Sequence, residues 1–301
     1  MTKSKEVNMK LHFRILLAAV MLAALGYTAA AQPRLTPCEL AAAGSVTAPS
    51  LPKHMTCTVG GEKREALVYA PSITLKDGKL PVVFAFHGHG GNMQGTAQLM
   101  HIQTVWPEAI VVYPQGLKGR PSPVDPQGLK PGWQVEANQA NVGNKDLEFF
   151  DAMVETLRQK YSVDDTRIYS TGFSNGGIFS YLLWAERAQT IAAIGEVAGR
   201  LWDSEQLTQP RAALAIAGRN DTTDLFALQQ KTINEKARPA DNANAPGQQC
   251  AVPGGAQSGT QCTHYSSTTH TPVKTLIHPG AHVYPAWAPQ EIVDFFKAHH
   301  L

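Results

Sequence analysis

The five residues at positions 172–176 read Gly-Phe-Ser-Asn-Gly, a pattern that suits a serine acting as a nucleophile. A short apolar strand is predicted just before them, at residues 167–171, and a helix is predicted to follow, at residues 175–187. Glycines flank Ser174 because so tight a turn between strand and helix leaves no room for larger side chains. The helix N-terminus offers N–H groups and partial positive charge to an anion that forms beside Ser174. The pattern therefore predicts nucleophilic chemistry at this serine, and its alternative is a glycine-rich turn without chemistry.

A serine hydroxyl is a weak nucleophile at neutral pH and needs a neighbouring base, most often a histidine. His282 lies in a predicted loop between the last strand, at 273–277, and the last helix, at 291–299. His278 is the competitor, but it ends the apolar strand, where a histidine is more often a packed residue. The other candidates lie in a polar loop and at the tail, and we expect them to be solvated: His264, His270, His299 and His300. We therefore predict His282 as the base.

An acidic side chain should orient that histidine, and after a serine in this kind of turn it usually precedes the histidine in the chain. An apolar strand is predicted at 212–217, and Asp221 follows it at the carboxyl edge of the sheet. Asp224 lies three residues further on and is the alternative. Asp146 reads more simply as a carboxylate at a helix N-terminus, where it caps free N–H groups. We predict Asp221 as the orienting acid.

Residues 87–92 read His-Gly-His-Gly-Gly-Asn and follow another apolar strand, predicted at 81–86. Such a turn exposes backbone N–H groups toward the oxyanion of a tetrahedral intermediate. We assign one donor to the N–H of His89 and the other to the N–H of Asn175. The side chains of His87 and His89 are spaced like metal ligands, yet the sequence offers no third ligand, so we expect neither a metal nor a cofactor.

Strands alternate with helices from residue 81 to the C-terminus, which predicts an α/β fold with a mostly parallel sheet covered by helices on both faces. The other expected elements are strands at 109–113 and 191–197, a helix at 146–161, and an antiparallel edge hairpin of residues 56–59 and 66–70. Residues 115–143 are rich in proline and glycine and read as a long surface loop. Residues 237–261 read as a low-complexity insertion.

The first 31 residues differ from the rest of the chain. Basic residues precede an unbroken apolar run at 15–25, and three alanines at 29–31 form a small-residue cleavage site. This pattern is typical of a secretory signal peptide, because the apolar run is shorter than the ~20 residues that span a bilayer. We therefore predict a secreted mature protein with one domain from residue 35 to 301. A membrane anchor is the alternative for the first segment.

Composition excludes some classes of partner and favours disulfides. The formal net charge is +2 and no basic stripe is present, so nucleic acid is not an expected partner. No later segment of the sequence is apolar enough to cross a membrane, so we do not expect the mature protein to bind a membrane. In an oxidising compartment the four cysteines can pair in three ways. Proximity in the sequence favours the pairs Cys38–Cys57 and Cys250–Cys262.

Several stretches resemble the polyhydroxybutyrate depolymerase and feruloyl esterase family of α/β-hydrolases. They are residues 84–92, 146–177, 218–221 and 280–285, within a resemblance that covers nearly all of residues 55–298. The resemblance implies the α/β-hydrolase fold and a cofactor-free serine esterase. It also implies that Ser174, Asp221 and His282 form the catalytic triad.

Two of these stretches depart from the family's pattern. The family's acid loop usually reads His-Gly-Thr-x-Asp, of which this chain keeps Gly218 and Asp221. The family's histidine loop reads Gly-Gly-His-x-Trp-Pro, where this chain has Ala281 and Tyr284. The match to the family is therefore weaker at the acid loop that carries Asp221 than around Ser174.

The resembled family includes esterases that release ferulate from plant-wall arabinoxylan and enzymes that cut short-chain polyesters. Extracellular polyester depolymerases often carry a separate polymer-binding domain, whereas this chain ends one helix after His282. We therefore expect a feruloyl or acetyl ester of plant-wall polysaccharide as substrate, with polyester as the alternative. Trp133, Tyr284 and Trp287 are candidates to line an aromatic acyl pocket, and ordinary packing is the alternative for each. A rival of another class is a non-catalytic carbohydrate-binding protein on a hydrolase scaffold.

Overall fold

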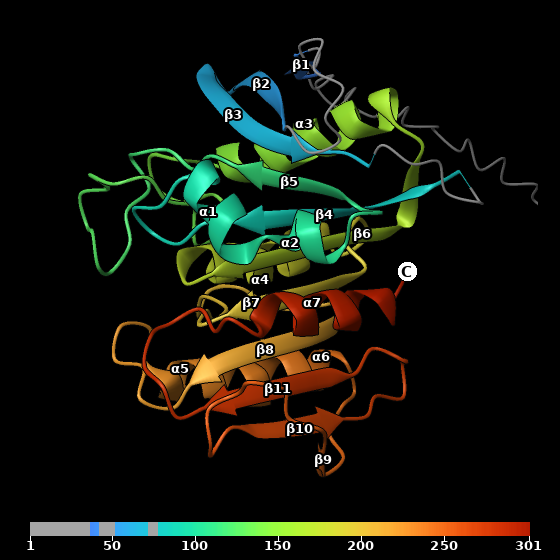
Figure 1. Ribbon diagram of the computed structural model, residues 1–301. Coiled ribbons are helices and arrows are strands. Elements are labelled where there is room, and N and C mark those ends of the chain that lie inside the picture. Colours follow the sequence, from blue (N-terminus) through green and yellow to red (C-terminus); the bar gives the residue numbers. More distant parts are fainter. Residues whose placement is uncertain (1–36, 42–51, 72–77) are drawn as a thin grey trace, which may run out of the picture. The chain divides into compact units, whose positions relative to one another are not determined.

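A computed structural model of the chain describes residues 37–41, 52–71 and 78–301. Its strands are β1 (Glu39–Leu40), β2 (Lys53–Val59), β3 (Glu62–Tyr69), β4 (Leu80–Phe86), β5 (Ile110–Pro114), β6 (Val163–Phe173), β7 (Ala193–Val197), β8 (Ala212–Gly218), β9 (Gln248–Gln249), β10 (Gln261–Tyr265) and β11 (Val273–His278). They form one sheet in the order β1-β2-β3-β5-β4-β6-β7-β8-β11-β10-β9 (Figure 1). The predicted signal peptide, residues 1–31, lies outside the described residues.

The middle of the sheet is parallel and its two ends are antiparallel. Strands β5, β4, β6, β7, β8 and β11 run parallel to their neighbours, as the continuous apolar runs predict. The predicted hairpin is β2 and β3, and it joins β5 antiparallel, with β1 outside it. Strands β10 and β9 extend the opposite end in the same antiparallel manner. Nearly every residue of β4, β5 and β8 is buried, which fits a sheet covered on both faces.

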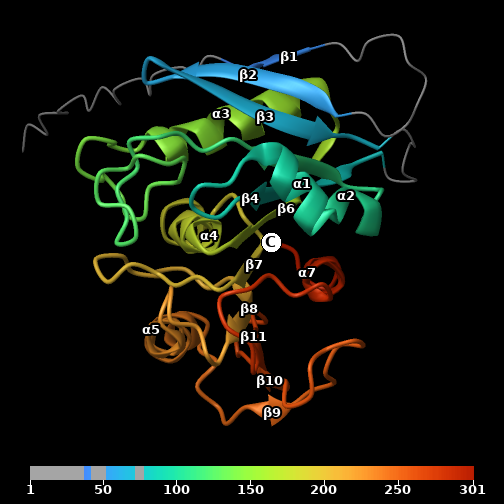
Figure 2. The same ribbon diagram turned by 60° about the vertical axis from the view of Figure 1, so that its left-hand side comes forward.

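Helices cover both faces of this sheet. They are α1 (Met93–Met100), α2 (Ile102–Val105), α3 (Lys145–Lys160), α4 (Asn175–Arg187), α5 (Phe226–Lys231), the π-helical segment η1 (Thr232–Ala237), α6 (Arg238–Ala240) and α7 (Ala288–Lys297). Helices α1, α2 and α7 lie on one side of the sheet, and α3, α4 and α5 lie on the other (Figure 2). Buried residues of α1, α2 and α7 belong to one hydrophobic core, and those of α3, α4 and η1 belong to the other. The predicted α/β architecture is therefore confirmed. Within the described part of the chain, no helix has the length and apolar character needed to span a bilayer.

Some helices were not expected from the sequence. Helix α1 contains Gly95 and buries only four of its eight residues, so its apolar periodicity is weak. It begins instead at a polar cap, where the side chain of Asn92 accepts a hydrogen bond from the Gly95 N–H at 2.8 Å. The run α5–η1–α6 was likewise not predicted. It ends inside residues 237–261, so the predicted low-complexity insertion also contains α6 and β9.

A buried ionic network holds the long loop of residues 115–143 against the sheet. Asp146, in the first turn of α3, pairs with Arg64 at 2.7 Å and with Arg120 at 3.0 Å. Its second oxygen accepts the backbone N–H of Gln134 at 2.8 Å. Burial alone would raise the pKa of the Asp146 carboxyl, but the two arginines hold it below its usual value. Asp146 is therefore more than a helix cap, because it fastens strand, helix and loop together.

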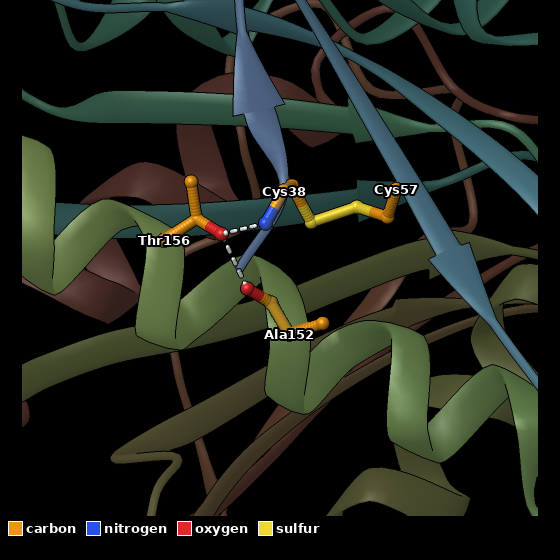
Figure 3. The surroundings of a disulfide bond; sticks show 4 residues. All are labelled: Cys38, Cys57, Ala152 and Thr156. Carbon is orange, nitrogen blue, oxygen red and sulfur yellow. Dashed lines mark hydrogen bonds between the residues drawn. A yellow bond between two sulfur atoms is a disulfide. The ribbon is translucent and has the colours of Figure 1, made fainter. Parts of the chain in front are cut away.

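The two disulfides favoured by sequence proximity are both present. Cys38 is bonded to Cys57, which ties the residue before β1 to β2, and Cys250 is bonded to Cys262 at the start of β10. Figure 3 shows how the first of these is anchored to α3: Thr156 Oγ1 accepts the Cys38 N–H at 2.8 Å and donates to the Ala152 carbonyl at 2.7 Å. This contact fixes the edge of the sheet on the helix that also carries Asp146.

Candidate active site

Ser174 lies in a strained turn between β6 and α4. Its backbone angles, φ 56° and ψ −120°, are those of a residue held in a conformation that L-amino acids rarely adopt. The glycines on either side are required by contact distances. A Cβ on Gly172 would lie 2.2 Å from the Gly176 carbonyl carbon, and a Cβ on Gly176 would lie 2.2 Å from the Phe86 carbonyl oxygen. The backbone is therefore packed too tightly here for any side chain larger than hydrogen.

His282 joins Ser174 to Asp221 in one hydrogen-bonded chain. Its Nε2 is 2.8 Å from Ser174 Oγ and its Nδ1 is 2.7 Å from Asp221 Oδ2. In the tautomer that suits this geometry, Nδ1–H donates to the carboxylate and Nε2 is free to accept the serine proton. The ring of Phe173 packs against the imidazole with ring centres 5.0 Å apart, which limits its movement. The three side chains predicted as a triad are thus brought together from β6, β8 and β11.

Asp221 is held from several sides, which fixes the carboxylate that faces His282. Its Oδ1 accepts the backbone N–H groups of Thr223 at 2.9 Å and Asp224 at 3.1 Å. Its Oδ2 accepts a further hydrogen bond from Gln229 Nε2 at 2.9 Å, beside the one from His282. The positioning role of Gln229 was not predicted, because a glutamine in an unpredicted helix gives no signal in the sequence.

The competing residues have other partners. The Asp224 carboxylate pairs with Arg200 at 2.8 Å instead of with His282. Burial raises the pKa of Asp224, although the charge of Arg200 lowers it. His278 is buried at the end of β11, where its Nδ1 accepts the Gly280 N–H at 3.1 Å and burial lowers its pKa. It is a packed residue, as expected from its position in the strand.

The glycine-rich turn after β4 lies directly beside Ser174. A Cβ on Gly88 would be 3.4 Å from the Cβ of Ser174, so the backbone of this turn approaches the nucleophile closely. His87 is buried, its Nε2 accepts the Gly116 N–H at 2.8 Å, and burial lowers its pKa to about 4. The imidazole of His87 is therefore neutral and structural. The N–H groups of His89 and Asn175 remain the predicted oxyanion donors.

The side chains of those two residues position the long loop. His89 Nε2 is 2.9 Å from Asp125 Oδ2, and the Asn175 amide brackets the backbone of Trp133, accepting its N–H at 2.7 Å and donating to its carbonyl at 3.1 Å. Neither role was predicted, because both depend on a loop whose course the sequence does not reveal. Nowhere in the described ranges do three or more His, Cys, Asp or Glu side chains form a group able to hold a metal ion.

Comparisons with known proteins show which proteins this chain is similar to. No protein-family model matches the chain. The probable feruloyl esterase C of Aspergillus clavatus is 28% identical over 279 residues, covering 88% of this chain and 94% of that protein. The feruloyl esterase C of Emericella nidulans is 28% identical over 271 residues, covering 83% and 91%. The structure is also similar to an acetyl xylan esterase from Aspergillus awamori, with a TM-score of 0.61 at 16% identity, covering 81% of this chain and 99% of that one.

The chain has the α/β-hydrolase fold and is similar to feruloyl esterases over most of its length. These relatives are named as esterases, and the fold of this chain is that of the solved esterase. Two cavities of this hydrolase meet at Ser174 and share His89, Val124 and Thr223.

The two cavities of the hydrolase differ in size and in lining. The larger, about 390 Å³, is lined further by Gly88, Asp125, Leu129, Lys130, Phe173 and His282. The smaller, about 190 Å³, is lined further by Ile178, Arg200, Trp202, Asp224, Leu225 and Leu228, among others. The larger is therefore rimmed by charged groups, and the smaller has mostly apolar walls.

None of the three aromatic residues predicted to contact the acyl group lines either cavity. Trp133 is fully buried, packs between Phe86 and Phe179, and donates its indole N–H to the His87 carbonyl at 3.0 Å. The prediction is wrong for Trp133, because no substrate can reach a side chain enclosed by the core. Tyr284 and Trp287 pack against the core on the α7 side of the sheet. In this hydrolase the aromatic residue of the smaller cavity is Trp202, which was not predicted.

Proposed function

We propose that this chain is a secreted serine esterase that hydrolyses feruloyl or acetyl esters of plant-wall polysaccharide through an acyl-enzyme on Ser174. The observation that carries the proposal is the unbroken chain of hydrogen bonds from Ser174 Oγ through His282 to Asp221. The relatives named feruloyl esterase, which align with most of the chain, support the choice of substrate. The two disulfides support secretion, because such bonds persist in oxidising compartments.

The first half-reaction transfers the acyl group to the serine. His282 Nε2 takes the proton of Ser174 Oγ as this oxygen attacks the ester carbonyl carbon, and the carbonyl π electrons move onto the carbonyl oxygen. The N–H groups of His89 and Asn175 stabilise that oxyanion. When the intermediate collapses, the bond to the alcohol oxygen breaks and His282 donates its proton to the leaving alcohol. Asp221 holds Nδ1–H throughout and stabilises the imidazolium.

The second half-reaction releases the acid by the same groups in reverse order. His282 takes a proton from water, and the resulting hydroxide oxygen attacks the acyl carbon. The second tetrahedral intermediate collapses with cleavage of the bond to Ser174 Oγ, which regains its proton from His282. The net reaction consumes one ester and one water and gives one carboxylic acid and one alcohol, without a metal or cofactor.

Loss of the serine hydroxyl should abolish turnover. In Ser174→Ala we expect kcat for 4-nitrophenyl acetate to fall by up to about 10⁶-fold, as for other triad serines. A fluorophosphonate probe should label the wild type at the peptide that contains Ser174, as measured by mass spectrometry. Ser204→Ala, which removes an exposed serine hydroxyl, is the matched control and should keep full activity. Full activity in Ser174→Ala, or no labelling, would revive the non-catalytic carbohydrate-binding alternative.

A substrate panel tests the ester class separately from the mechanism. We expect purified protein to turn over methyl ferulate or acetyl-xylan faster than a polyhydroxybutyrate film, with released acid measured by chromatography. Faster release of hydroxybutyrate would favour the polyester depolymerase alternative. The N-terminus of the secreted protein, read by mass spectrometry, should be Gln32, which follows the predicted cleavage site.

A further inference from the structure

The position of His282 distinguishes the two cavities by function. In the proposed mechanism His282 must deliver a proton to the leaving alcohol, so the alcohol has to lie on its side of Ser174. Among the described residues, His282 lines the larger cavity but not the smaller one. The larger cavity therefore receives the alcohol, which is a sugar in the proposed substrate. The smaller cavity is left for the acyl group.

The smaller cavity has mostly apolar walls, and besides a few neutral polar residues it contains one ion pair. Its walls include Ile178, Leu225 and Leu228, which suit a flat hydrocarbon such as an aromatic ring. The ion pair is Arg200 with Asp224, whose Nε and Oδ1 atoms are 2.8 Å apart. A lining without charged groups would be enough for an acetyl or other alkyl group. The presence of this pair points to an acyl group that is apolar along its length and carries a polar substituent.

The pair leaves one acceptor without a partner. Asp224 Oδ2 is buried and receives no hydrogen bond from any of the described residues. The guanidinium of Arg200 lies over the ring of Trp202, 4.3 Å from its centre, so the arginine is held in place from another side. A buried carboxylate oxygen without a donor is unfavourable, and a ligand hydroxyl would satisfy it. A second carboxylate would not, because it brings negative charge to this oxygen and has no proton to donate.

We propose that Arg200 and Asp224 are specificity-determining residues that select hydroxylated aromatic acyl groups, with the phenolic O–H donating to Asp224 Oδ2. This inference rests on the proposed function, since it assigns a ligand to the acyl side of Ser174. The inference distinguishes the feruloyl from the acetyl esters of the proposed function, because a hydroxycinnamoyl group carries a phenol and an acetyl group does not. The Arg200–Asp224 ion pair then determines which acyl group binds, while Asp221 orients His282 for proton transfer.

Methyl esters that differ only at the ring's para position test the inference in the wild type. We expect kcat/KM for methyl 4-hydroxycinnamate to exceed that for methyl cinnamate and for methyl 4-methoxycinnamate by about ten- to a hundredfold, the usual worth of a hydrogen bond to a charged group. Equal values for the three esters would overturn the inference. Preference for the monomethyl ester of an aromatic dicarboxylic acid would also overturn it, because the cavity would then select an anion.

Asp224→Asn tests the role of the free oxygen. Arg200 Nε must still meet an acceptor, so the amide oxygen faces it and the amide nitrogen takes the position of Oδ2. The acceptor becomes a donor, and we expect the ratio of kcat/KM for the 4-hydroxy over the 4-methoxy ester to fall at least about tenfold. Asp151→Asn weakens a comparable ion pair with Arg187, lines neither cavity, and should keep the wild-type ratio.

The two proposals fail in distinguishable ways. If the Ser174→Ala variant keeps its esterase activity, the proposed function is wrong, whatever the ratio between the aromatic esters. If Ser174→Ala is inactive but Asp224→Asn keeps the wild-type ratio, the serine mechanism stands and the assignment of Asp224 is overturned. Circular dichroism of the variants excludes misfolding as the cause of a changed ratio.

Discussion

Asp221 and Asp224 are three residues apart in one loop, but their carboxylates face different partners. The first accepts from His282 and from two backbone N–H groups, and the second pairs with Arg200. The sequence could show only that both follow the same apolar strand. The backbone turn after β8 decides which carboxylate faces His282. It directs Asp221 toward the histidine and places Asp224 in the wall of the smaller cavity.

Asp221→Asn should therefore lower the rate for every ester alike. In this variant the amide oxygen must accept the Thr223 and Asp224 N–H groups, so the amide nitrogen faces His282 and favours the wrong imidazole tautomer. The neutral amide also stabilises the imidazolium less than the carboxylate does, so we expect kcat to fall by about 10³–10⁴-fold with 4-nitrophenyl acetate and methyl ferulate. Steady-state kinetics on the two esters measures this. Asp224→Asn should instead change the relative rates among aromatic esters. A uniform loss in Asp224→Asn together with a small one in Asp221→Asn would reverse the two roles.

Single aromatic residues were the least predictable part of the site. Trp133 stands in a loop rich in proline and glycine, where nothing in the local pattern shows that the backbone turns inward. The burial of Trp133 depends on the Asn175 amide, which binds its backbone from 42 positions along the chain. No local sequence pattern predicts the position of Trp202, because its place in the smaller cavity depends on the course of the chain after β7. The triad was predictable because each member follows an apolar strand.

At the level of elements, the turn between β6 and α4 shows why the predicted pattern needs its glycines. Gly176→Ala would bring a Cβ to 2.2 Å from the Phe86 carbonyl oxygen, which is backbone of β4 and cannot move aside. We expect the free energy of unfolding to fall by about 1–3 kcal/mol or more, and esterase activity to be lost with the geometry of Ser174. Urea denaturation and 4-nitrophenyl acetate assays measure the two effects.

Gly254→Ala is the matched control for that variant. A Cβ at Gly254 would have no atom within 4 Å, so the change adds the same methyl group without a contact. We expect both stability and activity to stay close to those of the wild type. If Gly176→Ala were as stable and active as Gly254→Ala, the close packing of β4 against α4 would not be what makes this glycine necessary.

Elements were predictable where burial imposes a long apolar pattern. The runs that became β4, β5, β8 and α3 are buried over most of their length, so their sequences carry the period of the structure. Helix α1 and the run α5–η1–α6 are short or partly exposed, and capping or tertiary packing decides them. Strand β9 has two exposed residues and forms through its pairing with β10. Such elements cannot be predicted from local sequence, because local sequence does not determine them.

Across the whole molecule, the parallel sheet is what assembles the site. Strands β4, β6, β8 and β11 end at the same edge, and the loops that follow them carry His89, Ser174, Asp221 and His282. Asp241 marks the opposite end of β8, where its Oδ1 accepts the Arg211 N–H just before the strand begins. It is fully buried, and Arg211 is the only charged group that favours its ionised form among the described residues. Burial raises its pKa to about 8.

This carboxyl should make the stability of the protein fall as the pH rises. The unfolded chain releases the proton near pH 3.8, whereas the folded protein keeps it until about pH 8. Between these values the folded state binds more protons, so the free energy of unfolding declines with increasing pH, by at most about 1.4 kcal/mol for each pH unit. Asp241→Asn keeps the acceptor for Arg211 and cannot ionise. It should therefore be more stable than the wild type at pH 8, by about 1 kcal/mol or more, and show a flatter pH dependence.

Urea denaturation at pH 5, 6.5 and 8 measures these slopes. Asp294→Asn removes an exposed carboxylate and controls for the change in net charge. Curves for wild type and Asp241→Asn that run parallel across this range would mean that Asp241 ionises in the folded state without cost. Because Asp241 lies at the end of β8 away from Asp221, relative kcat values should follow the fraction of folded protein in both variants. A stability gain at pH 8 without a change in kcat would show that this end of the sheet serves folding while the other serves catalysis.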